Sequence, residues 1–86
     1  MPSPIRLTDQ AVVTAARALI VENKRCAARL KDASLSEEQG ATLGEYLVLL
    51  DAAMREIEAL YDERRVFNRH LSSFDALYAA ISVDEA

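Results

Sequence analysis

The sequence is poor in the residues that usually stabilise a small fold or build a metal site. It contains one cysteine, one histidine, two glycines, two prolines and no tryptophan among 86 residues. Cys26 alone cannot form a disulfide within the chain, and His70 alone excludes a histidine-rich metal site within one chain. We therefore expect no metal and no cofactor. In a chain of this length, the free energy gained by burying apolar surface is nearly cancelled by the conformational entropy lost on folding. A second chain is therefore the expected source of extra stability.

Long apolar runs are also missing. The longest run, Tyr46 to Leu50, is far too short to span a bilayer. The first residues lack the charged start and apolar stretch of a signal peptide. Together with the lone thiol, these features predict a cytoplasmic protein that has no membrane partner.

The charge is unevenly distributed along the chain, whose formal net charge is −4. Residues 1–31 carry six basic and two acidic residues, whereas residues 32–86 carry four basic and twelve acidic ones. This split predicts two oppositely charged helices that complement each other within one hairpin. A basic face for nucleic acid, or an acidic face for a basic protein, is the alternative.

The first third of the chain has the spacing of a helix. Apolar and small residues recur at alternating steps of four and three, which is typical of a heptad seam. The seam comprises Val12, Ala16, Leu19, Asn23, Cys26, Leu30 and Ala33. Thr8 is a favourable N-cap residue. The pattern predicts a helix over 9–32, preceded by an extended segment over 1–7.

A second and longer seam follows the turn at 32–36. Ser36 and Gln39 match a capping box that opens the second helix. The seam comprises Leu43, Tyr46, Leu50, Ala53, Ile57, Leu60, Arg64, Phe67, Leu71, Phe74, Tyr78 and Ile81. Its continuity favours one helix over 37–82. Ser72 and Ser73 instead resemble a new N-cap, with Asp75 in the capping-box position, and so long a helix is unusual.

We favour a break near 72, a short third helix over 74–82 and a frayed tail over 83–86. The short turn at 32–36 makes the two long helices antiparallel neighbours. In that register Val12 lies near Leu60, and Lys24 lies near the acidic start of the second helix. The seam beyond residue 64 then has no partner in the first helix.

One neighbouring helix cannot cover the second helix. A further apolar stripe follows its seam at Leu47, Met54 and Tyr61, and the helix is apolar on nearly every side around Val48. The fold class predicted is therefore all-α: a single domain over 1–86, formed by an antiparallel helical hairpin. Two such hairpins are expected to pair into a four-helix bundle.

Several residues allow both a structural and a functional interpretation. Asn23 on the seam is interpreted as a hydrogen-bonded structural residue, with control of register and oligomeric state as the alternative. Cys26 is interpreted as a small buried apolar residue rather than a reactive thiol. Gly40 and Gly44 form a G-x-x-x-G motif, which favours close approach of another backbone.

The charged residues of the second helix indicate no catalytic site. No Glu-x-x-His pair is present, and the spacing turns most carboxylates outward to solvent. Four basic residues cluster near its end, namely Arg64, Arg65, Arg69 and His70. Arg64 is expected to form an ion pair with an acid of a partner chain or to extend past Leu60 into solvent. An anion site or a contact for an acidic partner is the alternative.

These patterns favour a non-catalytic protein–protein interaction module, an adaptor, regulator or inhibitor that acts as a homodimer. The predicted partner contacts are Leu47, Met54, Phe67, Leu71, Phe74 and Tyr78. One alternative is a nucleic-acid-binding regulator that uses Lys24, Arg25, Arg29 and Lys31. Another is a small helical enzyme with a site between two chains, built on Arg64, Arg69 and His70. A chain of a different protein could also cover the apolar surface of the second helix.

Overall fold

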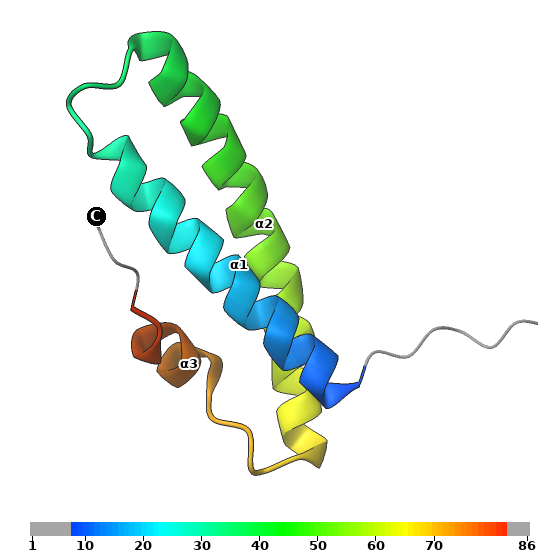
Figure 1. Ribbon diagram of the computed structural model, residues 1–86. Coiled ribbons are helices and arrows are strands. Elements are labelled where there is room, and N and C mark those ends of the chain that lie inside the picture. Colours follow the sequence, from blue (N-terminus) through cyan, green and yellow to red (C-terminus); the bar gives the residue numbers. More distant parts are fainter. Residues whose placement is uncertain (1–7, 83–86) are drawn as a thin grey trace, which may run out of the picture.

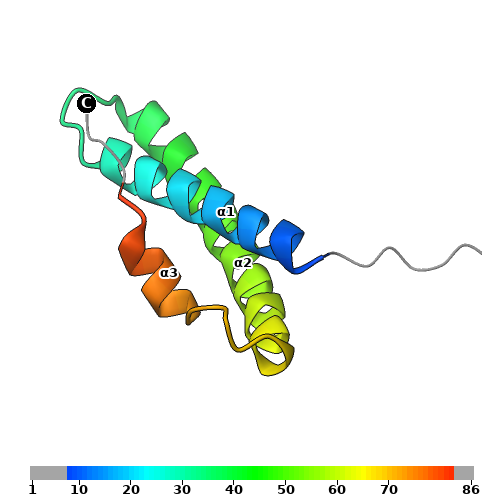
Figure 2. The same cartoon turned by 60° about the horizontal axis from the view of Figure 1, so that its bottom comes forward.

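The computed structural model describes residues 8–82, which form three helices. Helix α1 spans Asp9–Leu30, α2 spans Glu37–Phe67 and α3 spans Phe74–Ala80. Helices α1 and α2 form an antiparallel hairpin, and α3 folds back beside it (Figures 1 and 2). The predicted helical hairpin with a short third helix is confirmed. The segments predicted at 1–7 and 83–86 lie outside the described residues.

The first two helices begin where their capping residues predict. The Thr8 hydroxyl accepts a hydrogen bond from the Ala11 amide at 3.1 Å, and Asp9 follows in the first turn. At the start of α2, Ser36 and Gln39 exchange both bonds of a capping box, at 3.0 and 3.1 Å. The backbone amides of Ser36 and Gln39, which would otherwise lack a partner at the start of α2, are thereby satisfied.

The turn between α1 and α2 is stabilised by Asp32. Its carboxylate accepts hydrogen bonds from the backbone amide and the hydroxyl of Ser34, at 2.9 and 2.8 Å. These two bonds favour the charged carboxylate and lower the pKa of Asp32. A side chain bonded to the backbone two residues on is a turn-forming arrangement, so α1 ends and the chain reverses.

Helix α2 ends at Phe67, earlier than the break predicted near 72. Asn68 takes an extended conformation, and its side-chain oxygen accepts a bond from the His70 amide at 3.1 Å. This local bond competes with continuation of the helix. Helix α3 then starts at Phe74, after the N-cap residue Ser73, whose hydroxyl accepts from the Ala76 amide. The capping-box position therefore belongs to Ala76, and the assignment of that position to Asp75 was wrong.

The core lies where all three helices meet. Its buried members are Val12, Ala16, Ile20, Tyr61, Phe74 and Leu77. Tyr61 and Phe74 pack edge to face with ring centroids 5.8 Å apart, and the Tyr61 hydroxyl donates to the Ser72 carbonyl at 2.8 Å. The expectation that the seam beyond residue 64 lacks a partner in α1 was wrong for Phe74, because α3 reverses and places it on α1, whereas Phe67 stays 84% exposed.

Two polar contacts fix the register of the hairpin away from this core. The Asn23 amide donates to the Asp51 carboxylate at 2.7 Å, and the Cys26 thiol lies 3.5 Å from the Leu43 carbonyl. Both Asn23 and Cys26 are buried. Asn23 thus has the satisfied structural position expected of it, and Cys26 packs as a small buried residue.

The two glycines of α2 have no close neighbour within the described residues. A Cβ built at Gly40 or Gly44 would meet nothing within 4 Å, so no second backbone approaches them inside the hairpin. The close approach suggested by their spacing is therefore not made within residues 8–82. Glycine in a helix interior costs stability, because it loses more backbone entropy on folding than alanine.

We expect Gly44→Ala to raise the free energy of unfolding by about 0.5–1 kcal/mol, the usual helix-propensity difference. Urea denaturation followed by circular dichroism measures this change. The matched control is Ala41→Gly in the same exposed stretch of α2, which should lower stability by a similar amount. A Gly44→Ala protein that is less stable would show that something packs closely against this position.

Candidate interaction surface

The hairpin has two sides, and α3 covers only one of them. On α2 the seam through Leu50 and Ile57 faces α1, and Tyr61 and Met54 lie on the side that packs with α3. Successive residues of a helix are turned by about 100°. This rotation places Leu49 and Phe67 on the opposite side of the seam, away from α3, while Leu60 lies between them and the core, against which it packs.

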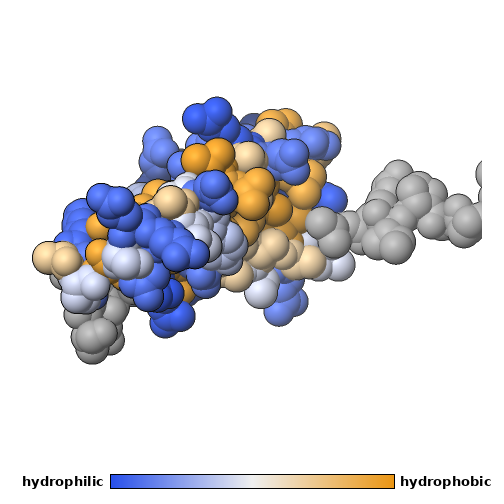
Figure 3. All heavy atoms as spheres, turned by 90° about the horizontal axis from the view of Figure 1, so that it is seen from above, coloured by the Kyte–Doolittle hydropathy of each residue, from blue (hydrophilic) through white to orange (hydrophobic). Residues whose placement is uncertain are grey.

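We call this second side the open flank. On α2 it carries Tyr46, Leu49, Ala53, Leu60 and Phe67, and on α1 it carries Ala11, Ala15 and Leu19. Phe67 is 84% exposed and Leu49 is 68% exposed, whereas the alanines and Leu60 are half-buried. Figure 3 shows apolar side chains gathered among charged ones on the face seen from above. Apolar side chains gathered on one side of a helix and bordered by charged residues are a feature of interaction surfaces.

Carboxylates border the open flank on α2. Glu45, Glu56 and Glu63 are all exposed and follow its outer edge. On the inner edge, partial desolvation, and then the charge and hydrogen bond of Glu22, raise the pKa of Tyr46 above its ordinary value. These influences favour the neutral phenol over its charged form.

The six predicted partner contacts lie in different environments. Phe67 is on the open flank. Phe74 is buried in the core, 6% exposed, and Leu71 and Met54 pack against that core. Two remain at the surface in part: Leu47 is half-buried and Tyr78 is 37% exposed.

The sequence pattern did not single out Leu49 as a surface candidate. The signal was present, since Tyr46, Leu49, Ala53, Leu60 and Phe67 follow heptad spacing. Several apolar stripes run along α2, however, and only the position of α3 shows which of them are left uncovered; Val48 and Val66 on the back of α2 are exposed as well.

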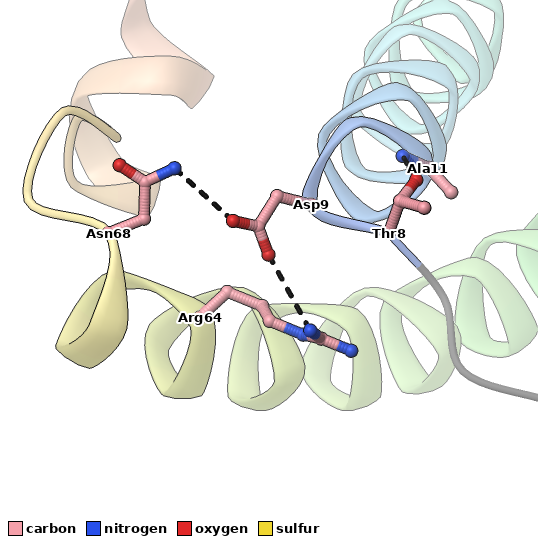
Figure 4. A network of polar contacts seen from close by, with 5 residues as sticks. All are labelled: Thr8, Asp9, Ala11, Arg64 and Asn68. Atoms are coloured by element: carbon pink, nitrogen blue, oxygen red, sulfur yellow. Dashed lines mark hydrogen bonds and ion pairs between the residues drawn. The ribbon is translucent and has the colours of Figure 1, made fainter.

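The predicted basic cluster is distributed over several contacts. Arg64 forms an ion pair with Asp9 of the same chain at 3.5 Å, and Asn68 donates to the other Asp9 oxygen at 3.2 Å (Figure 4). The expectation that Arg64 pairs with an acid of a partner chain is thereby corrected. Arg65 donates to the Leu71 carbonyl at 3.4 Å, and Arg69 and His70 are exposed in the following turn.

Lys24 on α1 holds the end of α3. Its ammonium group donates to the carbonyls of Tyr78 and Ile81 at 2.5 and 2.6 Å and lies 4.2 Å from the centroid of the Tyr78 ring. The carbonyls at a helix C-terminus carry partial negative charge, and a cation there is stabilising. Lys24 was expected near the acidic start of α2, so this position is a correction. Arg25, Arg29 and Lys31 remain exposed.

Two open hollows lie at this end of the hairpin. One, of about 480 Å³, lies between α1 and α3 beside Lys24, Lys31 and Tyr78. The other, of about 310 Å³, lies between Arg29 and the first turns of α2. Both are shallow surface features, and the Lys24 ammonium group at the first already bonds two carbonyls.

Among residues 8–82, no group of three or more His, Cys, Asp or Glu side chains is placed to hold a metal ion. The described helices include none that is both long and apolar enough to cross a membrane. Comparison of the chain with protein-family models, curated proteins and solved structures gives no match. A function must therefore be inferred from the surface of the protein itself.

Replacing Lys24 with methionine should loosen α3 while leaving the α1–α2 hairpin folded. We expect the free energy of unfolding to fall by about 1–2 kcal/mol, because two hydrogen bonds from a charged donor are lost. Hydrogen–deuterium exchange should rise in α3 and little elsewhere. Lys31→Met, at the exposed residue that caps the C-terminus of α1, is the control. Unchanged protection of α3 in the Lys24 variant would contradict the role assigned to this contact.

Proposed function

We propose that the chain is a non-catalytic protein–protein interaction module that acts as a homodimer. The observation that carries the proposal is the open flank, where Leu49 and Phe67 stand largely exposed beside half-buried apolar neighbours. Residues 8–82 provide no further segment that covers this side. A second copy offers an identical flank at an equal concentration, which makes it the simplest cover.

The energetics favour such a cover. Burying one exposed leucine or phenylalanine side chain contributes about 1.5–3 kcal/mol, and natural proteins have only about 5–15 kcal/mol of net stability. The buried core here comprises few large side chains, with Ile20, Tyr61 and Phe74 among them. Burial of Leu49 and Phe67 against another chain is therefore a large gain for so small a protein.

Whether the dimer acts as an adaptor, a regulator or an inhibitor depends on the partner that it binds. A buried free thiol at Cys26 suits the reducing cytoplasm, where we place the protein. The exposed Arg25, Arg29 and Lys31 form a smaller basic surface than the sequence suggested, since Lys24 is engaged by α3. This supports a protein partner more than a nucleic acid.

Light scattering coupled to size-exclusion chromatography tests the homodimer. We expect the wild-type protein at micromolar concentration to elute with twice the 9.5 kDa mass of the chain. Leu49→Glu should weaken dimerisation at least tenfold, because it places a charge in a desolvated interface, at a cost of about 1.4 kcal/mol or more.

Val48→Glu is the matched control. Val48 is 67% exposed and Leu49 is 68% exposed, so the two substitutions remove similar exposed side chains. Val48 is turned by about 100° from Leu49, toward the back of α2 and away from the open flank. Its variant should stay dimeric. A monomeric wild-type protein, or equal effects of the two substitutions, would count against the proposal.

A further inference from the structure

The open flank also contains information about how two copies fit together. Two hairpins can stack flank on flank in two symmetric ways. A twofold axis parallel to the helices places α1 of each copy over α2 of the other, whereas an axis across the helices places like helices over like. We infer that the copies adopt the first arrangement, with α1 antiparallel to α2 of the second copy. This inference rests on the proposed homodimer.

Side-chain size favours that arrangement. The α1 part of the open flank is built mostly from small residues, Ala11 and Ala15, and the α2 part carries the bulky Leu49 and Phe67. Large side chains set against small ones fill an interface to the density of a protein interior. If α1 packed on α1 and α2 on α2, the bulky residues of α2 would be crowded together and gaps would remain between the alanines of α1.

Charge favours it as well. Stacking α2 on α2 would bring the acidic border of Glu45, Glu56 and Glu63 toward the same border of the second copy, which is repulsive. Helix α1 instead offers Arg29, which is exposed at the edge of the flank. The acid on this side of α1, Glu22, already interacts with Tyr46 of its own chain.

The symmetry fixes the register. Within one chain, Asn23 is level with Asp51, as their hydrogen bond shows, and Asp9 is level with Arg64. Arg29 lies as far after Asn23 as Glu45 lies before Asp51, so Arg29 and Glu45 share one level. A twofold axis parallel to the helices leaves heights unchanged. Arg29 of one copy therefore meets Glu45 of the second copy, as an opposite-charge pair.

The available area is sufficient for a stable dimer. Helix α1 has 22 residues, and at about 1.5 Å per residue it is ~33 Å long. Two helices side by side are ~20 Å wide, so stacking covers roughly 650 Å² on each copy. The total of about 1,300 Å² lies within the range of specific protein–protein interfaces.

Cysteine cross-linking between copies tests the arrangement. In a Cys26→Ala background, Arg29→Cys and Glu45→Cys are made as two separate proteins, each with one thiol. We expect that mixing and oxidising them gives a disulfide-linked dimer on a non-reducing gel, while neither protein alone cross-links. Because each chain has a single cysteine, any covalent dimer reports a contact between copies. Val48→Cys mixed with Arg29→Cys is the control and should stay uncross-linked.

A third variant identifies the opposite arrangement. Leu19→Cys in the same background lies at the middle of α1, where two copies of α1 would cross if like helices stacked. Efficient cross-linking of this variant alone, or no cross-linking of the mixed pair in a protein that is still dimeric, would overturn the inferred arrangement and leave the homodimer standing. Light scattering on each variant separates these results from a monomeric protein, which would overturn the proposed function itself.

Discussion

The contact between Tyr61 and Phe74 decides which side of the hairpin is closed. The two rings meet edge to face in the core, and the Tyr61 hydroxyl anchors the connecting segment through the Ser72 carbonyl. Lys24 holds the other end of α3 through two carbonyls. With both ends fixed, α3 lies on one side of the hairpin, and the exposure of Leu49 and Phe67 on the opposite side follows from that placement.

Local sequence signals were sufficient for the helices but not for the way they pack. Caps at Thr8 and Ser36 predicted the two helix starts, because a side-chain oxygen and the backbone donors it satisfies are adjacent in sequence. The apolar seams predicted the hairpin because the spacing of apolar residues can be read directly along the sequence. The end of α2 was misplaced because Asn68 ends the helix through two contacts: its side-chain oxygen accepts from the nearby His70 amide, and its amide group donates to Asp9, which is distant in sequence.

The exposed surface was harder to predict from local sequence patterns than the helices were. Met54, Phe74 and Phe67 all follow apolar spacing, yet the first two pack in or against the core and the third is largely exposed. Periodicity tells which residues share a face of a helix, but not which face another segment covers. That information depends on the reversal of the chain after α2. The partner of Arg64 was missed likewise, because Asp9 meets it only once the hairpin has closed.

Within the described residues, α3 is too short to cover more than part of one side of the hairpin. Helix α3 has 7 residues and α2 has 31, so at about 1.5 Å per residue the third helix covers only ~10 Å of a hairpin ~45 Å long. An exposed apolar flank of this kind invites non-specific association. Its border of Glu45, Glu56 and Glu63 opposes contact with surfaces that are acidic or merely apolar, because burying unpaired carboxylates is costly. Only a surface that supplies both apolar contacts and a positive charge satisfies the flank and its border together, and α1 with Arg29 is such a surface.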